Sequence, residues 1–182
     1  MSKLTLSELK KELNQYDQKQ LTQLVADLYK LNDDVKNYLG TRFKGEEAII
    51  ELFETAKKQI NDEFFPERGF GKMRLSEAKN AISKFKKLSN DDLKTLDLML
   101  YYVEVGTKFT NTYGDIDIKF YKSMVSMYSN VVDAVSQDEK IFDIFADRLY
   151  AVVEVSEGTG WGYHEALDDL YYSLEWSWEE EE

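Results

Sequence analysis

The chain has 182 residues, of which 43% are hydrophobic, 14% aromatic and 32% charged, a composition that excludes an intrinsically disordered protein. Its formal charge of −12 disfavours general nucleic-acid binding, and the absence of cysteine excludes disulfides and thiolate metal sites. A single proline and only nine glycines favour long helices over a sandwich of short strands.

Residues 1–65 predict a group of amphipathic helices. Ser7 is a candidate N-cap of a short first helix, and the next helix is expected to start near Asp17. The second helix has an apolar stripe at steps of three and four residues, made of Leu21, Leu24, Val25, Leu28 and Leu31. A further apolar pattern covers residues 45–64 and ends at Pro66, because proline pushes the preceding residue out of the helical region.

Residues 66–74, PERGFGKMR, predict the main loop, because they combine two glycines with three basic residues. Arg68, Lys72 and Arg74 are candidate binding residues, since backbone amides freed by glycine beside basic side chains suit a phosphate or an acidic peptide. The alternative interpretation is an ordinary surface loop. The segment lacks the spacing of a phosphate-binding loop and follows no predicted strand, so that motif is rejected.

A helix with Ser76 as its candidate N-cap follows, and residues 66–88 together carry seven basic and two acidic side chains. The next predicted helix, residues 91–110, is apolar around most of its circumference, so we expect it to lie between other helices as the central element. It also carries Asp97 and Glu104. We expect tyrosine or lysine side chains to bond these carboxylates, because unpaired buried carboxylates are costly.

Three further helices are predicted at residues 116–135, 139–156 and 162–177, with Asp115 as a candidate N-cap of the first. Short connections imply antiparallel neighbours, so we predict an all-α fold of about seven antiparallel helices, either a HEAT-like stack of helical hairpins or an irregular bundle. The expected layout is one domain over residues 1–182, with N-terminal helices at 1–65, the basic loop at 66–74, a C-terminal helical layer at 75–178 and an acidic tail at 179–182.

The stretch GTGWGYHEALDD near the C-terminus allows two interpretations. In the first it is a turn between helices, where Gly158 ends one helix in the left-handed conformation and Thr159 or Gly162 caps the next. Trp161 then packs over the turn. This interpretation accounts for most of the motif without a ligand.

In the second interpretation the stretch is a site. His164 and Asp168 lie one helical turn apart on the same face, an arrangement that suits an oriented base or a metal ligand. One histidine cannot form a multi-histidine zinc site, so we assign no catalytic and no metal-ligating residue. Trp161 and Tyr163 join His164 and Asp168 as candidate binding residues.

Four segments together resemble a known family: MSKLTLSELKKELNQYDQKQL, RLSEAKNAISKFKKL, DLMLYYVEVGTKFTNTYGDI and GTGWGYHEALDDLYY. They are similar to landmarks of an uncharacterised bacterial family, all-helical and catalogued as a domain of unknown function. The resemblance implies a bacterial cytoplasmic protein. It carries no activity to any residue.

These observations predict a binding or scaffolding module with a protein partner and no cofactor. One histidine, no cysteine and no nucleophile motif favour a role without catalysis. The alternatives are a nucleic-acid or phosphate binder using residues 66–88 and a metal-assisted hydrolase centred on His164. No apolar run has the length of a membrane span or of a signal peptide, so we expect a cytoplasmic protein that does not enter the membrane. The oligomeric state is left open.

Overall fold

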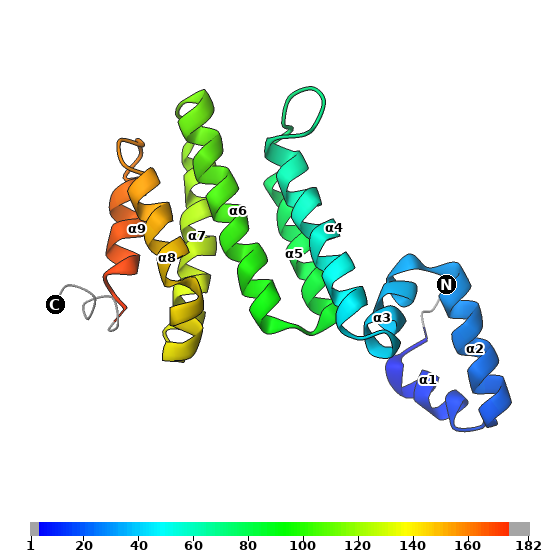
Figure 1. Ribbon diagram of the computed structural model, residues 1–182. Coiled ribbons are helices and arrows are strands. Elements are labelled where there is room, and N and C mark those ends of the chain that lie inside the picture. The colour runs from blue at the N-terminus through cyan, green and yellow to red at the C-terminus, as the bar shows by residue number, and fades with distance from the viewer. Residues whose placement is uncertain (1–3, 175–182) are drawn as a thin grey trace. The chain divides into compact units, whose positions relative to one another are not determined.

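The computed structural model describes residues 4–174, and within this range the chain forms nine α-helices and no β-strand (Figure 1). The helices are α1 (Leu6–Leu13), α2 (Gln18–Leu31), α3 (Asp33–Phe43), α4 (Glu46–Phe64), α5 (Leu75–Ser89), α6 (Asp92–Tyr113), α7 (Ile118–Val135), α8 (Glu139–Val155) and α9 (Tyr163–Tyr171). The all-α prediction is confirmed, whereas about seven helices was too few. None of the described helices is long and apolar enough to cross a bilayer. The end of the predicted helix 162–177 and the acidic tail 179–182 lie outside the described residues.

Helix α3 has no counterpart among the predicted helices. Val35 and Leu39 recur at helical spacing, but the segment also contains Gly40 and a polar run at 32–34, which are common in loops. The polar run begins the helix, because the Asn32 side chain accepts a hydrogen bond of 2.7 Å from the backbone N–H two residues later. The polar run therefore supplies the N-cap of α3.

The first two helices both begin with a side-chain N-cap. Helix α2 starts next to Asp17, as expected, and the Asp17 side chain caps it by accepting a 2.8 Å hydrogen bond from the backbone of Gln20. The prediction of Ser7 for α1 was wrong, because Thr5 is the cap. Its hydroxyl accepts from the backbone of Glu8 while the Glu8 carboxylate accepts from the backbone of Thr5, a reciprocal capping box.

Two later caps were also misplaced. Helix α5 begins at Leu75 with Arg74 at the N-cap position, so Ser76 lies inside the first turn. Asp117 caps α7 in place of Asp115, because its side chain accepts the backbone N–H groups two and three residues later, each at 2.8 Å. Asp115 is thereby free to contact the neighbouring connection.

The chain divides into two compact units within α4, an N-terminal unit of residues 1–49 and a C-terminal unit of residues 50–182. The N-terminal unit contains α1, α2 and α3. The C-terminal unit contains most of α4 and all of α5 to α9. That residues 1–182 form a single domain stays a prediction.

The C-terminal unit is a bundle of three stacked antiparallel hairpins, α4/α5, α6/α7 and α8/α9 (Figure 1). Helix α6 packs on α5, α7 and α8, and α7 packs on α9. The even-numbered helices α4, α6 and α8 form the first layer, and the odd-numbered helices α5, α7 and α9 form the second. Aromatic contacts of Phe64 on α4 with Tyr102 and Phe109 on α6 extend the first layer. This architecture lies within the predicted alternatives.

Helix α6 is the central element of this unit, as its apolar circumference predicts. Gly106 faces α7, and the buried Met124 side chain fills the space that a β-carbon at residue 106 would need. Four tyrosines of the core have bonded hydroxyls: Tyr102 with Ser123 at 2.9 Å, Tyr121 with Thr110 at 2.6 Å, Tyr128 with the Leu149 carbonyl at 3.1 Å and Tyr163 with Thr107 at 2.7 Å. The core thus satisfies its polar groups internally.

Candidate functional site

The two predicted binding regions lie at the same end of the C-terminal unit. Because its helices alternate in direction, the α4–α5, α6–α7 and α8–α9 connections all emerge at one end, the upper end in Figure 1. We call this end the loop edge, made of residues 65–74, 114–117 and 156–162. Sequence reasoning treated its parts as separate sites.

Contacts between neighbouring connections hold the loop edge together. The Phe65 ring lies 5.6 Å from the Phe109 ring and 6.1 Å from the Tyr113 ring between centroids. On the other side, the Gly160 backbone N–H donates to the Asp115 carboxylate at 3.2 Å. The connections are thus supported by packing against α6 and against one another.

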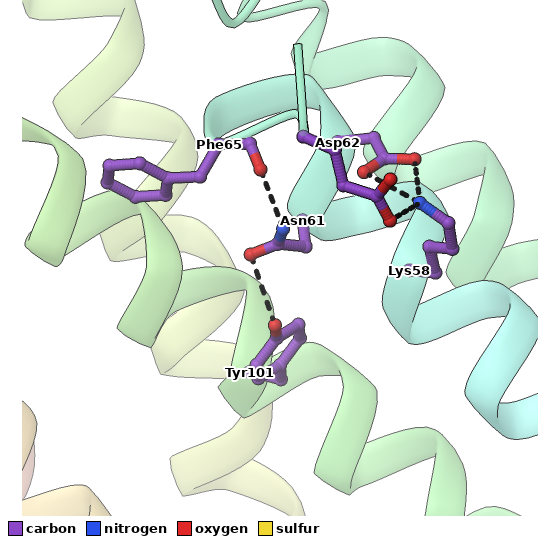
Figure 2. Close-up of polar contacts among 6 residues, drawn as sticks. Lys58, Asn61, Asp62, Phe65 and Tyr101 are labelled. Carbon is purple, nitrogen blue, oxygen red and sulfur yellow. Dashed lines mark hydrogen bonds and ion pairs between the residues drawn. The ribbon is translucent and has the colours of Figure 1, made fainter.

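The start of the long loop is bonded to α4 and α6. Figure 2 shows that the Asn61 side chain donates to the Phe65 carbonyl at 2.8 Å and accepts from the Tyr101 hydroxyl at 3.4 Å. In the same view the Lys58 ammonium lies 2.9 Å from Asp62, and it also pairs with Glu67 at 3.4 Å. These bonds fix the point at which the chain leaves α4.

The end of the same loop is held by a buried carboxylate. Glu63 accepts from the Arg74 backbone at 3.2 Å, from its Nε at 3.0 Å and from its Nη2 at 2.6 Å. Hydrogen bonding to Arg74 lowers the pKa of Glu63 below its ordinary value of 4.5. Arg74 was a candidate for binding a ligand, but its guanidinium is bonded within the protein.

The tip of the loop projects into solvent. The Phe70 side chain is 88% exposed, and Arg68 and Lys72 on either side of it are exposed as well. At the base, the Met73 backbone N–H donates to the Glu63 carbonyl at 2.8 Å. The Phe70 ring, with a cation on either side, is therefore presented at the tip of a loop whose base is held by hydrogen bonds.

The α8–α9 connection presents a second exposed aromatic residue. Gly158 and Gly162 adopt positive φ angles of 79° and 67°, in agreement with the predicted turn. Trp161 also has a positive φ, 66°, which is unfavourable for a residue with a β-carbon. Its side chain is 58% exposed, so more than half of its surface is open to solvent, and packing over the turn stays a prediction.

Tyr163, another predicted binding residue, belongs to the core. Its side chain is fully buried, and its hydroxyl lies 2.7 Å from Thr107 on α6. Burial raises the pKa of the Tyr163 hydroxyl well above its ordinary value. This residue joins α9 to the centre of the bundle and is closed to a ligand.

His164 bonds to the end of the preceding helix. Its Nδ1 lies 2.9 Å from the Ser156 hydroxyl and 3.2 Å from the Val153 carbonyl. The Val153 carbonyl can only accept, and it faces both the Ser156 hydroxyl, at 2.6 Å, and Nδ1, so the tautomer with hydrogen on Nδ1 fits this arrangement. The structure shows no hydrogen bond between His164 and Asp168, and residues 4–174 hold no group of three histidine or acidic side chains suited to a metal.

The carboxylates on the central helix have a partner that sequence reasoning missed. Arg148 on α8 donates Nη1 to Asp97 at 2.7 Å and donates Nε and Nη2 to Glu104 at 2.7 and 3.0 Å. The expectation of tyrosine or lysine was therefore wrong. Burial by itself lowers the pKa of Arg148, but the bonds to the two carboxylates outweigh it and raise the pKa. No local sequence signal could link Arg148 to partners that lie 44 and 51 positions away in the chain.

A model for a family of unknown function, DUF6155, matches residues 1–175. The chain belongs to this family. No curated protein and no solved structure matches the chain. The resemblance inferred from four sequence segments is thus confirmed as to family, and the DUF6155 match brings no activity with it.

The basic segment of this DUF6155 protein is partly neutralised. Besides the Arg74 pair with Glu63, the Lys86 ammonium lies 3.6 Å from Asp92, and Lys79 donates to a serine on α7 at 3.2 Å. A continuous row of free cations would suit a nucleic-acid backbone better.

A pocket of about 410 Å³ opens between α4 and α5 in the DUF6155 structure. It is lined by Gln59, Asp62, Glu63, Arg74, Glu77, Asn80, Ala81 and Lys84. The lining is polar and carries charges of both signs, several of them paired within the protein. The exposed aromatic side chains Phe70 and Trp161 of the loop edge do not line this pocket.

Proposed function

We propose that this protein is a binding module without catalytic activity, and that it contacts a protein partner through the loop edge. The observation that carries the proposal is the exposure of aromatic side chains there. Phe70 is 88% exposed and Trp161 is 58% exposed, and Tyr113 in the last turn of α6, next to the loop edge, is also exposed. Aromatic residues are enriched in protein interfaces and frequently supply most of the binding energy.

The exposure of these rings is costly for the isolated protein. Burying one large apolar side chain is worth about 1.5–3 kcal/mol, and Phe70 forgoes nearly all of this. Trp161 in addition keeps a left-handed backbone conformation, which costs about 1–3 kcal/mol in a residue other than glycine. A partner that covers both rings would recover the free energy of burying their apolar surface.

The bonded base of the loop edge supports the same proposal. Met73 and Arg74 tie one end of the long loop to Glu63, and Asn61 ties the other end to α6. A surface that is already ordered loses less conformational entropy on binding. The cations of Arg68 and Lys72 beside Phe70 favour a partner with acidic residues around an apolar pocket.

The test compares proteins captured from native lysate by the full-length chain and by variants. Phe70→Ser and Trp161→Asn remove the exposed rings, and asparagine tolerates the left-handed conformation of residue 161. Phe43→Ser is the matched control, because Phe43 is 84% exposed but lies in the N-terminal unit. We expect both loop-edge variants to lose a captured partner at least about 10-fold, as about 1.4 kcal/mol implies, and the control to keep it.

Equal loss in the Phe43→Ser control would contradict a role specific to the loop edge.

The two alternative functions have less support. Arg74 is engaged with Glu63, which weakens a nucleic-acid site at residues 66–88. Residues 4–174 hold no group of three histidine or acidic side chains suited to a metal, which weakens a metal-assisted hydrolase centred on His164. The bacterial origin and cytoplasmic location stay predictions.

A further inference from the structure

The N-terminal unit contains three helices but buries no apolar side chain in them. Neither α1 nor α2 has a buried residue, and Thr41 is the one buried residue of α3. Isolated helices of 8 to 14 residues are marginal in water and normally depend on the burial of an apolar face. These helices are strongly capped and amphipathic, yet the face that should stabilise them stays open.

The open face is best defined on α2. Leu21, Val25 and Leu28 are 38%, 45% and 44% exposed, and they follow one another at steps of four and three residues. Leu24 and Leu31 complete a continuous line, which we call the α2 stripe, of Leu21, Leu24, Val25, Leu28 and Leu31. A helix of 14 residues is about 21 Å long, so the α2 stripe runs along nearly the whole helix.

The charge distribution indicates what can approach the α2 stripe. Residues 1–49 carry eight basic and eight acidic side chains, whereas residues 50–182 carry 15 basic and 27 acidic ones. The whole net charge of −12 thus belongs to the C-terminal unit, and two C-terminal units repel each other. The neutral N-terminal unit is where a second copy can approach without that repulsion.

The pattern within the α2 stripe suits contact with itself. Leu21, Leu24, Leu28 and Leu31 occupy the a and d positions of two successive heptads, the spacing by which two helices interlock side chains. The positions bordering this seam are Gln20, Val25 and Asp27, so it is bordered by a single charge in each copy. In a two-fold symmetric dimer the same patch meets itself, and an uncharged centre avoids like-charge contacts.

We propose that the α2 stripe is a dimer interface, occupied by the α2 stripe of a second copy of this chain. The test is the molar mass of the full-length protein, measured by sedimentation equilibrium from about 1 µM to about 1 mM. We expect the weight-average mass to rise with concentration from 21.3 kDa towards twice this value. A mass of 21.3 kDa at all concentrations would overturn the proposal, and is the result expected if another protein or the C-terminal unit covers the α2 stripe.

Two charge-matched double variants identify the surface. Val25→Glu with Leu28→Glu places one carboxylate in the seam and one at its border, and we expect this protein to stay monomeric. Thr22→Glu with Gln23→Glu adds the same charge on the opposite side of α2, and we expect it to dimerise like the natural chain. Dimerisation of the first variant, or its loss in the second, would overturn the proposal.

Helix content from circular dichroism shows whether each variant is folded. If the two glutamates lower the helix content, the variant Val25→Gln with Leu28→Gln takes their place, because glutamine is a good helix former without charge and should also leave a monomer.

The dependence of dimerisation on ionic strength gives an independent test. Raising it from about 0.01 M to about 1 M should strengthen an apolar dimer of this acidic chain, since salt screens the repulsion between copies. A dimer that salt dissociates would contradict the proposal.

Discussion

Glu63 is a buried carboxylate that accepts three hydrogen bonds from Arg74 alone. One of them comes from the backbone, so the carboxylate fixes both the position of the chain and the direction of the guanidinium. Because the Arg74 side chain remains about half exposed, solvent screens part of the interaction. The pair holds the N-cap position of α5 against the last turn of α4.

Replacing the acid by the neutral Glu63→Gln should lower the free energy of unfolding by about 1 kcal/mol at neutral pH. The pKa of Glu63 in the folded protein is lowered from 4.5, so its contribution is complete above that pH and is lost as the pH falls through the folded pKa. Urea unfolding at neutral pH and well below pH 4.5 checks this. A difference between the two proteins that is equal at both pH values would contradict it.

His164 shows how one side chain can serve the turn and still resemble a site. Its Nδ1–H donates to Ser156 at the end of α8, which satisfies a group at the helix terminus. His164 and Asp168 lie one turn apart in α9, as their spacing in the sequence predicts. The two side chains form no hydrogen bond with each other, because the imidazole turns towards the end of the preceding helix.

At the scale of elements, Arg148 links α8 to α6 across the first layer of the bundle. Its guanidinium bridges Asp97 and Glu104, which lie two turns apart on the same helix. The fork geometry of arginine matches a carboxylate in two parallel bonds, which lysine cannot reproduce. The bridge therefore sets the register between the two helices.

Arg148→Met should lower the free energy of unfolding by about 1–2 kcal/mol, since it leaves two partly buried carboxylates facing each other without a cation. Lys140→Met, at an exposed position on the same helix, removes the same charge and should change stability by less than about 0.5 kcal/mol. Denaturant unfolding of both variants measures the difference. Equal effects would show that net charge, and not the bridge, is responsible.

The whole molecule combines two units of different character. The C-terminal unit contains the buried aromatic core around α6 and all of the net negative charge. The N-terminal unit is neutral and exposes the α2 stripe. Regions with few buried apolar contacts open locally at low free energy, so the two units should differ in stability as well as in charge.

Amide hydrogen exchange read by mass spectrometry should show this difference. At a concentration where the chain is monomeric by its mass, amides of α1 and α2 should exchange much faster than those of α6 and α7. Both groups are helical, so intrinsic hydrogen bonding does not distinguish them. Equal protection in the two groups would mean that the N-terminal helices are stabilised in the monomer.

The sequence alone determined the helical class, most helix positions and the loop at residues 66–74, because periodic apolar residues, glycines and the proline act within a few neighbouring positions. It missed α3, whose polar start and internal glycine imitate a loop. It named Arg68 and Tyr163 alike as candidate binding residues, although Arg68 lies at an exposed loop tip and Tyr163 lies in the core.

Only the tertiary structure decided which side chains meet. The pairing of Arg74 with Glu63 joins residues 11 positions apart, and that of Arg148 with Asp97 joins residues 51 apart. Such pairs leave no periodic trace in the sequence, because the partner is chosen by how the hairpins stack. The same stacking brings three separate connections to one loop edge, whereas the local pattern of each segment fixes only its own helix.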